Sequence, residues 1–154
     1  MKELKIVNLV LCILASLCAS WIVGFPLVIT MVGGFIELIF TSDANDFGPL
    51  FIACVVGCVL VTATFVFEIV AMFSKKKSSY IAMYITSIVF NLISSIFFTV
   101  KLASYFGQDM GEGDELYGNF VLLYGPMIFG VGFCIAALVI TLVIAGKRDN
   151  VYRG

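Results

Sequence analysis

A short cationic turn, Lys75-Lys76-Lys77-Ser78-Ser79, separates two long apolar runs, and this arrangement restricts the fold more than any other feature of the sequence. Residues 49–74 before the turn and 80–106 after it are almost wholly apolar. Each run exceeds the ~20 residues that a helix needs to cross ~30 Å of hydrocarbon. Both runs are therefore predicted to be transmembrane helices, joined as a helical hairpin.

The amino-acid composition agrees with a membrane protein. Hydrophobic residues make up 62% of the chain and charged residues only 12%, which is more apolar than a soluble domain of 154 residues requires for one core. The formal net charge of -1 hides a separation of acidic and basic residues along the chain. We expect the lipid bilayer as the surroundings, and no nucleic-acid partner.

The positions of the charges predict the orientation, because cytoplasmic loops collect Lys and Arg. Lys2 and Lys5 precede the first apolar run, Lys147 and Arg148 follow the last, and the lysine turn lies between the middle two. The connections 41–48 and 107–118 contain acidic residues and no basic ones. The prediction is an all-α four-helix transmembrane bundle, a single domain over residues 1–154, with both termini cytoplasmic. The spans are about 4–40, 49–74, 80–106 and 119–146, with an inner loop at 75–79 and outer loops at 41–48 and 107–118, in a plasma or cytoplasmic membrane.

The first apolar segment, residues 4–40, is too long for one perpendicular span. We favour one tilted helix that is kinked near Pro26, since proline removes a helix hydrogen bond. Two alternatives remain open: residues 27–40 form an interfacial or re-entrant piece, or they form a β-hairpin around Gly33-Gly34. Exposed strand edges are unfavourable in lipid, which counts against the hairpin.

The N-terminal segment also has features of a cleavable signal peptide, with small residues at Cys18-Ala19-Ser20. The apolar character continues past that point to Phe40, however. A signal anchor that is retained in the protein is the prediction.

Small and polar residues recur at helical spacing within each span, which indicates the faces that meet in a bundle. On the last span, Gly132 and Ala136 form a small-xxx-small pair, and Gly125 shares their face, so these three are predicted helix-packing residues. The stripes are Asn8, Cys12, Ala15 and Ala19; Cys54, Gly57, Val61, Thr64 and Glu68; Tyr84, Ser87, Asn91, Ser94, Phe98 and Lys101; and Gly118, Gly125, Gly132 and Gly146.

Glu68 is the main candidate site residue. It lies about 10 Å from Lys75 along a helix, at 1.5 Å per residue, and therefore below the inner headgroups. A carboxylate at that depth is costly unless it is paired, protonated or hydrated. Either it has a structural role, pairing with a lysine or with Tyr84, or it handles ions or protons. The candidate intramembrane polar site is Glu68, Tyr84, Ser87, Asn91 and Ser94.

The sequence contains few residues that are typical of a catalytic site. The sequence has no histidine, and its five cysteines all fall inside the predicted spans without a Cys-x-x-Cys spacing. Four acidic residues between Asp109 and Glu115 suit a divalent cation, but their spacing differs from an EF-hand loop, and a solvated loop is the favoured interpretation. We predict no enzymatic activity, no cofactor and no metal.

Two functions are compatible with these features. The first is a non-enzymatic membrane protein that acts by helix association, as an accessory subunit, scaffold or immunity-type protein, with a second copy or another membrane protein as partner. The second is a small ion, proton or solute transporter or channel that uses Glu68 and the polar stripe of the third span. Association is preferred, because only one acid lies deep in the membrane.

Overall fold

The computed structural model describes residues 1–40, 47–106 and 124–147, and over these residues it is helical without any strand. The helices are α1 (Lys2–Phe40), α2 (Phe47–Met72), α3 (Lys77–Phe106) and α5 (Gly125–Gly146). All four are long and apolar enough to cross a membrane. The prediction of four apolar spanning helices is therefore confirmed at the level of length and composition.

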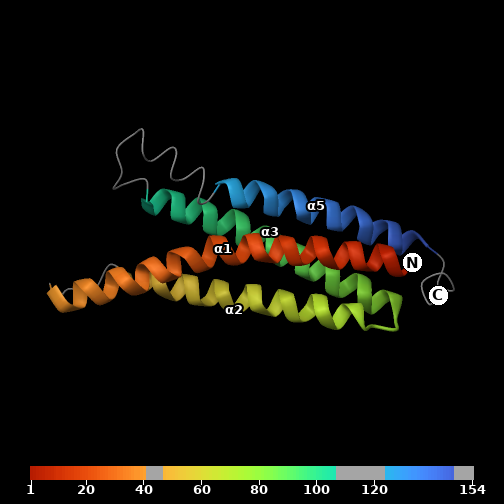
Figure 1. Ribbon diagram of the computed structural model, residues 1–154, viewed down its shortest axis with the longest axis horizontal. Helices are drawn as coiled ribbons and strands as arrows, with labels where there is room; N and C mark the ends of the chain where they lie inside the picture. Colours follow the sequence, from red (N-terminus) through yellow and green to blue (C-terminus); the bar gives the residue numbers. More distant parts are fainter. Residues whose placement is uncertain (41–46, 107–123, 148–154) are drawn as a thin grey trace.

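The helices lie side by side and alternate in direction, as Figure 1 shows. Helix α1 contacts α2 and α5 as neighbours and also touches α3, while α3 contacts α2 and α5. Helices α1 and α3 thus form the inner diagonal of the bundle. We call the end that holds Lys2, Met72, Lys77 and Gly146 the proximal end, and the other the distal end.

Helix α1 is a single element of 39 residues that passes through Pro26 without a break. It changes direction between its red first half and its orange second half (Figure 1), and its last part extends past the distal ends of the other helices. The β-hairpin alternative for residues 27–40 is wrong, and the chain does not turn back there. A helix satisfies its backbone hydrogen bonds internally, whereas an isolated hairpin leaves two unpaired edges.

The lysine turn is shorter than predicted, because Lys77, Ser78 and Ser79 already belong to the first turn of α3. Residues 73–76 connect the two helices, and the Ser74 hydroxyl donates to the Lys76 carbonyl at 3.2 Å. The Lys77 ammonium donates to the Lys147 carbonyl at the end of α5. A cation at a helix C-terminus is favourable, because the carbonyl groups there lack partners within the helix. Residues 119–123 of the predicted fourth span lie outside the described residues.

Two glycines leave room for side chains of the neighbouring helices. A Cβ atom placed on Gly57 of α2 would lie 2.6 Å from Phe98 of α3 and 2.7 Å from Val23 of α1. On α5, a Cβ on Gly130 would lie 3.1 Å from the Cβ of Cys18. Small residues at such positions are how helices pack in lipid, where no hydrophobic force drives them together.

The stripe residues predicted for the first three helices are buried, apart from Lys101. The glycine stripe of α5 is different: Gly132 and Gly146 have no atom within 4 Å of an added Cβ and lie on the outer surface. The face of α5 that packs in the bundle carries Gly130, Cys134, Ala137, Thr141 and Ile144. Gly132 and Gly146 therefore do not pack within the chain, and contact with another chain stays a prediction for them. Gly118 lies outside the described residues, and Gly125 is half-buried.

Candidate functional site

Glu68 of α2 is fully buried and is bound by side chains from two other helices. Its Oε1 atom accepts hydrogen bonds from the Ser16 hydroxyl of α1 at 2.9 Å and from the Ser87 hydroxyl of α3 at 2.5 Å. The Asn91 amide of α3 lies 3.4 Å from the same oxygen. One carboxyl oxygen thus joins three helices at the centre of the bundle.

The donors of Glu68 are themselves connected. Asn91 donates from Nδ2 to Ser16 Oγ at 2.8 Å, while its Oδ1 lies 3.3 Å from the Thr64 hydroxyl. The Tyr84 hydroxyl donates to the backbone carbonyl of Glu68 at 3.4 Å. Such a network orients its members, since moving one side chain breaks the bonds of others.

The second carboxyl oxygen of Glu68, Oε2, is buried and has no hydrogen-bond partner among the described residues. No described lysine or arginine pairs with this carboxyl. The ionisable groups that interact with it electrostatically are Cys12 of α1, Tyr84 of α3 and Cys134 of α5. None of these side chains supplies a positive charge to balance an ionised carboxylate.

A second polar cluster lies nearer the proximal end. The buried Asn8 of α1 donates to the Tyr80 hydroxyl of α3 at 3.1 Å and to the Thr141 hydroxyl of α5 at 2.9 Å. The Tyr80 and Tyr84 rings lie 4.5 Å apart, and the Lys5 ammonium lies 5.8 Å from the Tyr80 ring centre. This cluster joins α1, α3 and α5, so the two clusters together connect all four helices.

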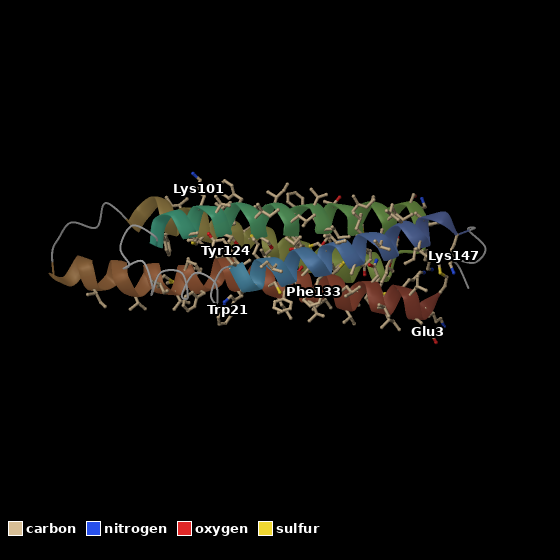
Figure 2. The ribbon with its side chains drawn as sticks, turned by 90° about the horizontal axis from the view of Figure 1, so that it is seen from above. Glu3, Trp21, Lys101, Tyr124, Phe133 and Lys147 are labelled. Carbon is tan, nitrogen blue, oxygen red and sulfur yellow. The ribbon has the colours of Figure 1, made fainter. Side chains whose placement is uncertain are left out.

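The polar face of α3 continues toward the distal end. Ser94, Ser95 and Thr99 are buried, and the hydroxyls of Ser95 and Thr99 have no partner among the described residues. From Tyr80 to Thr99 this face covers 19 residue steps, or about 28 Å at 1.5 Å per residue. Lys101 follows on the exposed side, and Figure 2 shows its side chain pointing away from the bundle. Buried polar groups therefore extend over roughly one hydrocarbon thickness.

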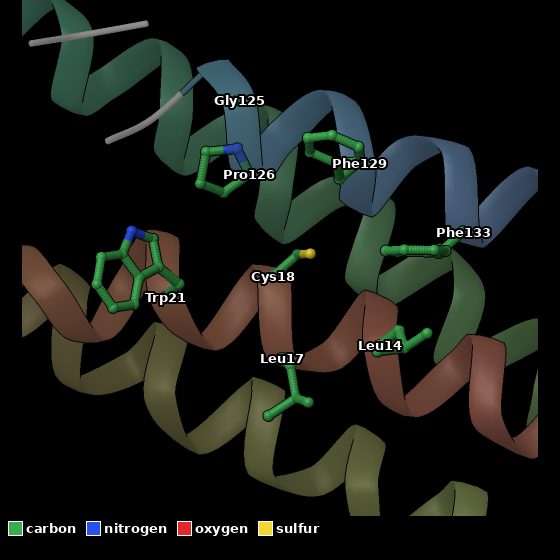
Figure 3. Close-up of a pocket in the computed structure, with 8 residues that line it drawn as sticks. All are labelled: Leu14, Leu17, Cys18, Trp21, Gly125, Pro126, Phe129 and Phe133. Carbon is green, nitrogen blue, oxygen red and sulfur yellow. The ribbon is translucent and has the colours of Figure 1, made fainter. Parts of the chain in front are cut away.

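An apolar groove runs along the outer surface where α1 and α5 meet, as Figure 3 shows. Its volume is about 520 Å³, and none of the buried polar residues lines it. Trp21 stacks on Phe25 at one end, with ring centres 5.6 Å apart. The lining residues are Leu14, Leu17, Cys18, Trp21, Gly125, Pro126, Phe129 and Phe133. A groove that is lined by such apolar side chains suits lipid chains or another apolar helix.

The five cysteines are unpaired thiols, and three of them, Cys12, Cys54 and Cys134, are buried among apolar side chains. Within the described residues, no three Cys, Asp or Glu side chains are placed to hold a metal ion. The acidic segment 109–115 lies outside these residues.

No protein-family model, curated protein or solved structure matches this chain.

Of the predicted site residues, the structure brings Glu68, Tyr84, Ser87 and Asn91 into one network, although Tyr84 binds the backbone of Glu68 and not its carboxyl. Ser94 is buried on the same face, three residues beyond Asn91. Sequence reasoning missed other polar residues: Ser16, which bonds to Glu68 directly, and Thr141, Ser95 and Thr99. The available signal was that each is a hydroxyl residue inside an apolar span, where polar side chains tend to face other helices.

Proposed function

We propose that this chain is a non-enzymatic multi-pass membrane protein that acts by helix association, with both termini cytoplasmic and the distal part of α1 as the contact surface. The buried polar clusters hold the four helices in one arrangement. The distal part of α1, which we define as residues 27–40, then presents apolar side chains to a partner.

The observation that supports this proposal is the exposure of the distal part of α1. Val28, Met31, Val32 and Ile36 are 60%, 56%, 55% and 50% exposed. Positions 28, 31, 32 and 36 follow the spacing i, i+3, i+4 and i+8, so these four side chains lie on one face of the helix. Figures 1 and 2 both show this part of α1 extending past the other helices.

The position of residues 27–40 along the bundle axis explains why their exposed apolar side chains need a partner. Gly57 meets both Val23 and Phe98, so these two residues lie at one level. Lys101 is about one turn beyond Phe98, where a cation marks the headgroup region. Residues 27–40 therefore lie at or beyond that region in an upright bundle. Each of these half-exposed apolar side chains would cost about 1–2 kcal/mol if water surrounded its exposed part.

A second copy of the chain is the partner that this geometry suits best. Copies in one membrane share one orientation, so two distal α1 segments stand side by side at the same height. Each then covers apolar side chains of the other, as helices do in a parallel coiled coil. Another membrane protein with an apolar helix at that height is the remaining kind of partner.

The experiment replaces Val28, Val32 and Ile36 with serine and measures the mass of the purified particle by light scattering in mild detergent. We expect the parent to be a dimer or a larger complex and the variant to be a monomer. The matched control replaces Val56, Val59 and Val66, which are 52%, 63% and 54% exposed on α2, with serine, and should keep the complex. A monomeric parent with no co-purifying protein contradicts the proposal.

Transport is the second candidate function, and the column of buried polar groups on α3 favours it. The hydroxyls of Ser95 and Thr99 lie distal to the Glu68 network, and Tyr80 lies proximal to it, so polar groups are present along most of the bundle. Glu68 does not line the groove between α1 and α5. It does not line the second surface hollow either, which lies along α3 from Leu92 to Lys101. A pH-dependent flux in reconstituted vesicles that is lost in Glu68→Gln would favour transport over association.

A further inference from the structure

The carboxyl of Glu68 has two oxygens in very different surroundings. Oε1 lies within hydrogen-bond distance of three donors, from Ser16, Ser87 and Asn91. Oε2 is equally buried, but no donor or acceptor of the described residues reaches it. An ionised carboxylate shares its charge between both oxygens, so half of that charge would have no hydrogen bond.

The groups around the carboxyl do not compensate for a negative charge. Helix α1 places Cys12 near Glu68, α3 places Tyr84 near it, and α5 places Cys134 near it; none is a cation. Lys5 lies over the ring of Tyr80, in the proximal cluster. An ion that is buried without a counterion loses its hydration and gains too little in return, so the neutral form is favoured.

A metal cation does not fit Oε2 either. Calcium takes about 6–8 oxygen ligands and magnesium about six in an octahedron. Oε2 is a single oxygen without another described oxygen in hydrogen-bond range, and the hydroxyls of Ser16 and Ser87 already point their protons at Oε1. One oxygen is sufficient for a proton.

We propose that Glu68 is a proton-binding site: in the assembled bundle, Oε2 carries a proton while Oε1, as the carbonyl oxygen, accepts the bonds from Ser16 and Ser87. This asymmetry matches a neutral carboxylic acid, whose carbonyl oxygen is the better acceptor and whose hydroxyl oxygen holds the hydrogen. The bound proton removes the charge from the centre of the bundle and keeps α1, α2 and α3 together. The site is independent of association, because it lies inside one chain.

Infrared spectroscopy of the purified protein in lipid nanodiscs tests the site directly. At neutral pH the parent should show the carbonyl stretch of a protonated carboxyl, shifted in heavy water, and Glu68→Gln should lose this band completely. The matched control is Glu3→Gln on the exposed start of α1, which should keep the band. Ser87→Ala should retain the band at a higher frequency, because one donor to the carbonyl oxygen is removed.

Three results overturn the proposal: no protonated-carboxyl band in the parent at neutral pH, a band that persists in Glu68→Gln, or a parent band that disappears when sodium is added at constant pH. The third result identifies a cation site. If Glu68→Gln does not fold, Ser87→Ala still decides, since only a band from Glu68 changes frequency when this donor is removed. An unchanged frequency in Ser87→Ala therefore also counts against the proposal.

Stability gives an independent measurement. A folded bundle that holds a proton which the unfolded chain has released loses stability as the pH rises, because the folded state then binds more protons than the unfolded one. When the pH is raised from mildly acidic to mildly alkaline, the unfolding temperature of the parent should fall more than that of Glu68→Gln. Parallel pH profiles for the two proteins would contradict a proton on Glu68.

Discussion

At the scale of single residues, Glu68 of α2 is the acceptor at which side chains of α1 and α3 meet. Three side chains from α1 and α3 point their donors at one of its oxygens. In lipid an interhelical hydrogen bond contributes about 0.6 kcal/mol on average and up to about 1.7 kcal/mol. The larger effect comes from removing the acceptor, because each donor that is left buried without a partner costs about 1–3 kcal/mol.

This difference predicts unequal effects for two substitutions at position 68. Glu68→Leu removes the acceptor of Ser16 and Ser87 and should lower the free energy of unfolding by about 2–6 kcal/mol, about 1–3 kcal/mol for each donor. Glu68→Gln keeps a carbonyl oxygen for the same donors and should stay close to the parent at neutral pH. Thermal unfolding in detergent measures both. Equal midpoints for the Leu and Gln variants would mean that these bonds do not stabilise the bundle.

At the scale of the helices, the position of a small residue on its helix decides whether it matters for packing. Gly57 faces α1 and α3 at distances too short for a side chain, whereas Gly132 faces outward with open space around it. Both are glycines inside apolar helices, so their intrinsic helix propensities are alike. Because Gly57 and Gly132 differ mainly in their surroundings, they form a matched pair for the same substitution.

Replacement by alanine should therefore affect the stability of the bundle differently at Gly57 and at Gly132. Gly57→Ala places a methyl group against Phe98 and Val23 and should destabilise the bundle by about 1–3 kcal/mol, the typical cost of overpacking. Gly132→Ala should leave the single chain unchanged or slightly more stable, since alanine favours the helix. Unfolding midpoints in detergent provide the comparison. A loss of stability at Gly132 that equals the loss at Gly57 would show that the outer face of α5 is also packed.

At the scale of the whole molecule, the alternation of charge along the chain predicts the orientation in the membrane. A cysteine-reactive, membrane-impermeant label should reach an engineered cysteine at Gly111 in intact cells, and one at Ser78 only after permeabilisation. The reason is that the lysines at 75–77 favour the cytoplasmic side, while the acidic segment 107–118 does not. Labelling at position 78 in intact cells would reverse the orientation.

The sequence alone determined the number of apolar helices and their approximate bounds, since a run of about 20 apolar residues has one main solution in lipid. It also placed Tyr84, Ser87 and Asn91 on one face of α3, because helical spacing is a local property. Only the tertiary structure decided that Ser16 of α1 meets Glu68, and that Gly132 and Gly146 of α5 face outward. Spacing relates residues of one helix to one another. The rotation of each helix about its axis depends on contacts with its neighbours, and in a helix that is apolar on all sides, such as α5, the sequence pattern leaves that rotation open.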